Sequence, residues 1–112
     1  MIFITQDSEL DIKHGMSIIY FYAPWLLFHN KISEYFIEIE KEFQDIKLYA
    51  IDIDQFNGLV TRFNILSLPT ILIVKDEGKL IKNVTGMLAI SGIGNIIRDI
   101  YKSYTNDHGD KK

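Results

Sequence analysis

The sequence predicts a single α/β domain, in which a central mixed β-sheet is flanked by helices on both faces. The first observation is that short apolar runs alternate with segments of helical periodicity along the chain. The second is the run Met16–Tyr22, which is almost continuously apolar and aromatic, as a strand buried on both faces should be. The third is the length of 112 residues, which suits one domain with a core of its own.

The expected order of elements is β-α-β-α-β-α-β-β-α. A first strand, Ile2–Thr5, precedes a short helical segment at residues 8–13 and the apolar strand already described. Near Phe28 the apolar spacing changes from that of a strand to that of a helix. One face of this helix carries four large apolar side chains: Ile32, Phe36, Ile39 and Phe43. The strand Lys47–Asp52 and a short helix at residues 57–63 follow.

The last third of the chain is expected to form a β-hairpin and a final helix. Pro69 stands at the entrance of the strand Thr70–Val74, where its missing amide costs no hydrogen bond of the ladder. The turn signal Asp-Glu-Gly at 76–78 leads into the partner strand, Lys79–Thr85. Ser91 is expected to cap the final helix. The inner face of that helix carries Ile93, Ile96, Ile97 and Ile100.

Composition limits the classes of function. The formal net charge is −3 and the lysines are spread along the chain, so nucleic acid is not an expected partner. No apolar run approaches the roughly 20 residues that span a bilayer, so a membrane is not an expected partner either. The three histidines stand far apart and there is no cysteine, so neither a metal site nor another cofactor is expected. Residues 1–104 are expected to form the domain, and the polar residues 105–112 a disordered tail.

The segment 21–29 reads Phe-Tyr-Ala-Pro-Trp-Leu-Leu-Phe-His. Its first five residues are those that protein disulfide isomerases carry directly before a Cys-x-x-Cys pair. Two further stretches agree with the same family: Ile-Asp-Ile-Asp at 51–54 and Phe-Asn-Ile-Leu-Ser-Leu-Pro-Thr-Ile at 63–71. On these residues the chain resembles thioredoxins and the thioredoxin domains of protein disulfide isomerases over residues 1–104. The resemblance implies a thioredoxin fold and a cis peptide bond between Leu68 and Pro69.

The catalytic groups of that family are missing. Leu26 and His29 stand where the family has its two cysteines, and Tyr20 stands in place of the buried acid. Ala50 occupies the position of a lysine that thioredoxins place near that acid. Thiol–disulfide exchange requires a thiolate, so the chain is expected to be redox-inactive and not to be a thiol–disulfide oxidoreductase. The resemblance therefore implies no catalytic residue.

The resemblance also implies that apolar side chains replace the exposed part of the active site. Each large side chain removed from water contributes about 1.5–3 kcal/mol, so three or four can anchor an extended peptide or a partner helix. Such apolar patches mark binding sites. The expected function is a peptide- or protein-binding or scaffold module. The expected groove consists of Trp25, Leu26, Leu27, Phe28, Leu68, Pro69, Met87 and Leu88.

Several alternatives stay open on the sequence. The exposed leucines and Phe28 could instead form a homodimer or fold inward. His29 could serve as an acid–base group of a non-thiol enzyme, although a packed or hydrogen-bonded histidine is expected because no second catalytic residue accompanies it. The chain could also be a non-catalytic subunit of a redox complex. Asp52 and Asp54 could hold a metal, but strand-end aspartates are expected to cap or turn the chain.

Localisation rests on weaker signals. Residues 1–5 have no basic region, so no signal peptide is expected and the chain as it stands is expected in the cytoplasm. The Phe-Tyr-Ala-Pro-Trp signature, in contrast, is typical of proteins of the endoplasmic reticulum. The lumen of that compartment is therefore the alternative, if the domain is cut from a longer precursor.

Overall fold

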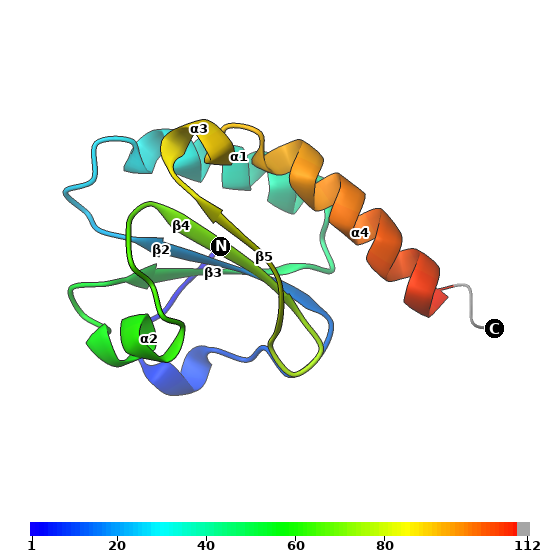
Figure 1. Cartoon of the computed structure of the whole chain (residues 1–112), viewed down its shortest axis with the longest axis horizontal. Helices are drawn as coiled ribbons and strands as arrows, with labels where there is room; N and C mark the ends of the chain where they lie inside the picture. The colour runs from blue at the N-terminus through cyan, green and yellow to red at the C-terminus, as the bar shows by residue number, and fades with distance from the viewer. Residues whose placement is uncertain (110–112) are drawn as a thin grey trace.

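The computed structural model describes the backbone of residues 1–109 and the side chains of residues 1–106 (Figure 1). Five strands are present in this part of the chain: β1 (Ile2–Phe3), β2 (Met16–Tyr22), β3 (Lys47–Asp52), β4 (Thr70–Lys75) and β5 (Lys79–Thr85). The helices are the 3-10 turn η1 (Asp7–Glu9), α1 (His29–Glu42), α2 (Asn57–Arg62), α3 (Met87–Ile90) and α4 (Ile93–Gly109). None of the described helices is long and apolar enough to cross a membrane.

The strands form one mixed sheet in the order β1-β3-β2-β4-β5. Strand β3 pairs in parallel with both β1 and β2, whereas β4 is antiparallel to β2 and β5 is antiparallel to β4. Helices α1, α3 and α4 lie on one face of the sheet, and α2 and η1 lie on the other (Figure 1). This is the thioredoxin fold that the resemblance implied.

Strand β2 holds the two faces together because its side chains alternate between them. Ile18 and Tyr20 belong to the core under α1 and α4, where they pack with Phe36. Ile19 and Phe21 belong to the core on the α2 side. All of these side chains are fully buried. The near-continuous apolar run of the sequence is therefore the signature of a central strand covered on both faces, as predicted.

The structure corrects the prediction before β2. The first strand ends at Phe3 rather than Thr5. The expected helical segment at residues 8–13 is reduced to η1, because Leu10 already has an extended backbone. The carboxylate of Glu9 accepts hydrogen bonds from the amides of Thr5 and Gln6, which stabilises a local turn instead of a longer helix.

Two further corrections concern the C-terminal part. Ser91 does not cap α4: an additional helix, α3, ends there, and the Ser91 hydroxyl donates to the carbonyl of Leu88 at 2.6 Å. Helix α4 continues to Gly109, so residues 105–109 are helical where a disordered tail was predicted. The hydroxyl of Thr105 donates to the carbonyl of Tyr101 at 3.0 Å within this helix. Residues 110–112, the rest of the predicted tail, lie outside the described residues.

The register brings four loops to one edge of the sheet. Tyr22, the last residue of β2, is opposite Asp52, the last residue of β3. Thr70, the first residue of β4, is opposite both Phe21 and Thr85. The segments that follow β2, β3 and β5, and the one that precedes β4, therefore meet at the same edge. All residues of the predicted groove lie in these segments.

Candidate functional site

The loop that follows β2 is a tight turn joined directly to α1. Ala23 is fully buried, and its carbonyl accepts a hydrogen bond from the amide of Leu26 at 3.0 Å. The carbonyl of Leu26 accepts from the amide of His29 at 3.2 Å, so the chain turns again into the first residue of α1. With Ala23 anchored in the core and His29 in the helix, the residues between them are forced outward.

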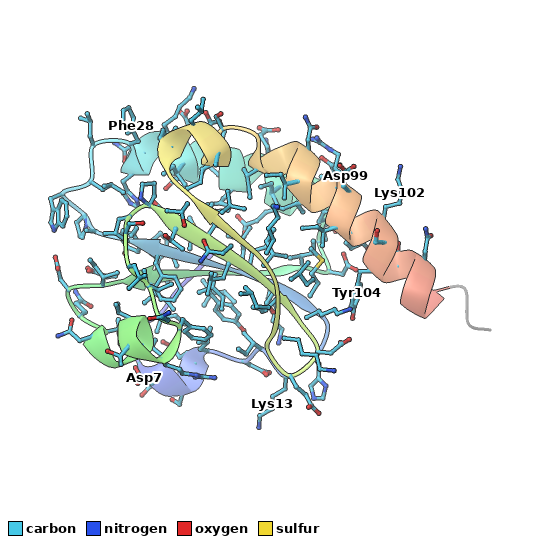
Figure 2. The ribbon with its side chains drawn as sticks, in the orientation of Figure 1. Asp7, Lys13, Phe28, Asp99, Lys102 and Tyr104 are labelled. Carbon is cyan, nitrogen blue, oxygen red and sulfur yellow. The ribbon has the colours of Figure 1, made fainter. Side chains whose placement is uncertain are left out.

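Large apolar side chains are exposed on this loop and on α3. The exposed fractions are 68% for Trp25, 85% for Leu27, 45% for Phe28 and 90% for Leu88. Figure 2 shows Phe28 at the start of α1. We call Trp25, Leu27, Phe28 and Leu88 the apolar surface. These four agree with the exposure that the sequence implied.

The other members of the predicted groove are less exposed. The Leu68–Pro69 peptide bond is cis, as the resemblance implied. Pro69 is buried, and its carbonyl accepts a hydrogen bond from the amide of Gly86 at 3.0 Å, which ties the loop before β4 to the start of α3. Leu26 and Leu68 are partly exposed, and Met87 packs against the core under α1 and α4. Pro69 therefore belongs to the packed interior at this edge of the sheet, and Met87 packs partly against the core.

One exposed apolar residue of this edge was missed by the sequence reasoning. Leu66 has an exposed fraction of 87% and lies two residues before Leu68. The available signal was a leucine in a predicted loop, which no strand or helix periodicity would bury. Leu66 also belongs to a shallow hollow on the α2 side, lined by Ile53, Val60, Ile65, Leu66, Ser67 and Leu68.

His29 is packed and hydrogen-bonded, in agreement with the reading that favoured this role. Its Nδ1 lies 3.0 Å from the hydroxyl of Tyr20. The imidazole stacks on Tyr22 with a centroid distance of 4.6 Å and an interplanar angle of 10°.

Burial raises the pKa of Tyr20, with a smaller contribution from Tyr22. Burial and then the charge of Asp52 raise the pKa of Tyr22. Both phenols therefore stay neutral at physiological pH and supply no general base.

Aromatic rings also fill the space around Ala50. This residue is buried on β3, opposite Phe3 of β1 and Tyr20 of β2. The Phe3 ring packs edge-on against Tyr22 at a centroid distance of 6.1 Å. A hydrophobic and aromatic cluster thus occupies the region to which the resemblance assigns an acid and a lysine.

The two strand-end aspartates have structural partners. The Oδ1 atom of Asp52 accepts from the amide of Asp54 at 2.9 Å, and its main-chain carbonyl accepts from the amides of Gln55 and Phe56. Asp52 thus turns the chain, as expected for this position. The indole Nε1–H of Trp25 donates to Oδ2 of Asp54 at 3.1 Å. Among the described residues, no group of three or more histidine, aspartate or glutamate side chains is placed to hold a metal ion.

Comparison with known proteins agrees with this geometry. The family model "Thioredoxin" matches residues 4–99. The thioredoxin of Borreliella burgdorferi is 33% identical over 86 residues, which are 76% of this chain and 73% of that protein. Mitochondrial thioredoxin O1 of Arabidopsis thaliana is 27% identical over 102 residues, which are 89% of this chain and only 52% of that protein.

The fold of a solved relative is also similar. The oxidised thioredoxin of Plasmodium falciparum superimposes with a TM-score of 0.78, covering 88% of this chain and 96% of that one at 22% identity. At this identity the likeness concerns the fold. Together with the family match over residues 4–99, it leads to one conclusion. The chain belongs to the thioredoxin family.

Proposed function

We propose that this chain is a redox-inactive binding module, which holds an extended segment of another protein on the apolar surface. The observation that carries the proposal is the exposure of four large apolar side chains at one edge of the sheet: Trp25, Leu27, Phe28 and Leu88. Exposed apolar patches usually serve as interaction sites. Burial of each such side chain contributes about 1.5–3 kcal/mol, before the cost of association is subtracted.

The main chain beside Pro69 supports an extended ligand. In the described part of the chain, neither the amide nor the carbonyl of Leu68 has a hydrogen-bond partner. An extended peptide that pairs with Leu68 would add a short strand to this edge, a common mode of peptide recognition. Apolar side chains of the same peptide would then lie against the apolar surface.

Because the chain has no cysteine, the proposed site can bind a segment but cannot carry out thiol–disulfide exchange. The chain has no thiolate with which to attack a disulfide. The position assigned to the second cysteine carries His29, whose Nδ1 is hydrogen-bonded to the neutral phenol of Tyr20. A bound segment would therefore be held and released unchanged.

An affinity capture experiment tests the proposal. We would compare wild type with the Leu27→Asp/Phe28→Asp variant, after circular dichroism has shown that both are folded. The matched control is Ile37→Asp/Leu80→Asp, which makes the same chemical change at two exposed apolar residues of α1 and β5. Partners retained by wild type and by the control, but lost by the Leu27/Phe28 variant, are the expected result.

Other outcomes would redirect the proposal. A partner list that is the same for all three proteins would move the function to another face. Capture of nothing, together with a concentration-dependent mass in sedimentation equilibrium that the Leu27/Phe28 variant abolishes, would replace partner binding by a homodimer through the apolar surface.

A further inference from the structure

We propose that Trp25 and Asp54 form a subsite for the side chain of an arginine or lysine residue in the bound segment. This inference rests on the proposed binding function and adds to it the charge of the ligand. It would make the module selective for apolar segments that carry a neighbouring basic residue, rather than for apolar segments in general.

The geometry of the pair leaves a cation-binding face exposed. The indole Nε1–H of Trp25 donates to Oδ2 of Asp54 at 3.1 Å, which holds the ring in one orientation. The indole is nevertheless 68% exposed. Its polar edge is thus satisfied within the protein, and what remains for a ligand is the face of the ring and the remaining acceptor sites of the carboxylate.

Both groups favour a cation. The face of an aromatic ring carries partial negative charge, and tryptophan is the side chain that binds cations best in this way. A guanidinium can stack on the indole and donate to a carboxylate at the ring's edge, because it is planar and has several N–H groups. A lysine ammonium can make the same two contacts as a point charge.

The charge of Asp54 is not neutralised within the described part of the chain. The ion pairs of that part involve five other carboxylates, those of Asp11, Glu34, Glu38, Glu40 and Glu42. The whole chain carries a formal net charge of −3, which favours approach of a basic segment. A ligand cation would therefore gain a partner without displacing one.

The position of the pair links the charge to the apolar surface. Trp25 is itself part of the apolar surface. Leu27 and Phe28 follow it two and three residues later in the chain. A segment that buries its apolar side chains against Leu27 and Phe28 passes beside Trp25. Its basic residue is thus expected next to its apolar ones.

Selection from a phage-displayed library of random peptides tests the subsite without a known ligand. We expect peptides selected on wild type to combine large apolar residues with an adjacent arginine or lysine. The variant Asp54→Asn removes the charge but keeps an oxygen that can accept from Nε1–H of Trp25. On this variant, selection should return the apolar residues with the basic one less often, because only the indole face of Trp25 still attracts a cation. The variant Asp99→Asn changes the net charge equally at an exposed residue of α4, well separated from Phe28 (Figure 2), and should select as wild type does.

Affinity then quantifies the effect. The selected peptide and its copy with neutral citrulline in place of arginine would be titrated against each protein. Trp25, the only tryptophan of the chain, gives an intrinsic fluorescence signal at the subsite. For wild type and Asp99→Asn the arginine peptide should bind roughly 3- to 30-fold more tightly, and added salt should reduce this ratio. For Asp54→Asn the ratio should fall several-fold and keep only the contribution of the Trp25 indole face, because the carboxylate charge is gone.

The outcomes separate this inference from the function on which it rests. Apolar peptides that show no basic enrichment, but are lost with Leu27→Asp/Phe28→Asp, would overturn the cation subsite and leave the binding function standing. An arginine preference as strong in Asp54→Asn as in wild type would also overturn the subsite. A wild-type protein that selects no peptide would count against both.

Discussion

The Tyr20 hydroxyl lies 3.0 Å from Nδ1 of His29, so a phenol and an imidazole are paired where the family resemblance assigns an acid and a cysteine. Tyr20 is fully buried in the sheet, whereas His29 is the first residue of α1 and is partly exposed. The hydrogen bond therefore ties the start of α1 to the central strand. At the place of the family's reaction centre this chain has a packing contact, which supports the loop carrying the apolar surface.

The first prediction concerns this hydrogen bond. The substitution Tyr20→Phe keeps the aromatic stack but leaves Nδ1 of His29 without its partner. We expect the free energy of unfolding to fall by about 1–2 kcal/mol, the usual cost of such a loss. Urea denaturation followed by circular dichroism measures it. A variant as stable as wild type would show that the bond contributes nothing net.

The second prediction is the pH dependence of stability. The pKa of Tyr20 is raised above the ordinary value of a tyrosine by burial and, to a lesser extent, by Tyr22. A group whose pKa is higher in the folded than in the unfolded state stabilises the fold below the unfolded pKa, and this stability is lost as pH rises above it. Stability should therefore decline above about pH 10, because the unfolded phenol ionises first.

The variant Tyr20→Phe tests the origin of that decline. It should lower the free energy of unfolding at neutral pH. It should also make the decline of stability at alkaline pH less steep, because one phenol with a raised pKa is removed. Urea denaturation at a series of pH values, with tyrosinate absorbance recorded in parallel, provides the measurement. An alkaline slope equal to that of wild type would assign the decline to the other tyrosines, of which Tyr22 also has a raised pKa.

The third prediction uses Ala50. A lysine introduced here would enter a buried position opposite Phe3 and Tyr20, with no carboxylate from either partner. We expect Ala50→Lys to lower the free energy of unfolding by at least about 3 kcal/mol, because an unpaired charge is buried. Ala50→Met is the control of similar length without charge. A methionine variant as unstable as the lysine variant would make overpacking, not charge, the cause.

The fourth prediction compares two buried hydroxyl groups. Ser17 Oγ has no hydrogen-bond partner in the described part of the chain. The Thr70 hydroxyl donates to the carbonyl of Ser67 at 2.7 Å. Ser17→Ala should leave stability unchanged or raise it by up to about 1 kcal/mol, because an unpaired polar group is removed. Thr70→Val should lower it by about 1–2 kcal/mol, since the carbonyl of Ser67 loses its donor. Thermal and urea unfolding measure both, and changes of equal sign would contradict the comparison.

The fifth prediction concerns the β4–β5 turn. Gly78 has a φ of +79°, and an added Cβ would lie 2.8 Å from Cδ1 of Ile12. Gly15 has a similar φ of +71°, but its Cβ would meet nothing within 4 Å. Gly15→Ala should cost about 1–2 kcal/mol through the backbone alone. Gly78→Ala should cost about 1 kcal/mol more, because Ile12 must also move. Equal losses in urea denaturation would show that Ile12 accommodates the methyl group freely.

Local patterns were sufficient for most of the fold. The apolar run of β2, the helical spacing of Ile32 and Phe36, and the Asp-Glu-Gly turn before β5 each depend on neighbours close in sequence. They failed at η1 and in residues 105–109. At η1 the short-range hydrogen bonds of Glu9 override helix periodicity. In residues 105–109 the helix that starts at Ile93 continues through polar residues, although polar composition alone indicated a tail.

The candidate site divides along a similar line. The exclusion of thiol–disulfide exchange follows from residue identity alone, because without cysteine no thiolate can form, whatever the fold. Residue identity does not determine which side chains of the site are exposed or paired. This holds for the 87% exposure of Leu66 and the burial of Pro69. It holds equally for the pairings of Tyr20 with His29 and of Trp25 with Asp54. Each pairing joins two segments that are distant in the chain, and the exposure of each loop residue depends on the segments that pack against its loop. Only the assembled sheet, which brings the ends of β2 and β3 and the start of β4 to one edge, brings those groups within contact distance.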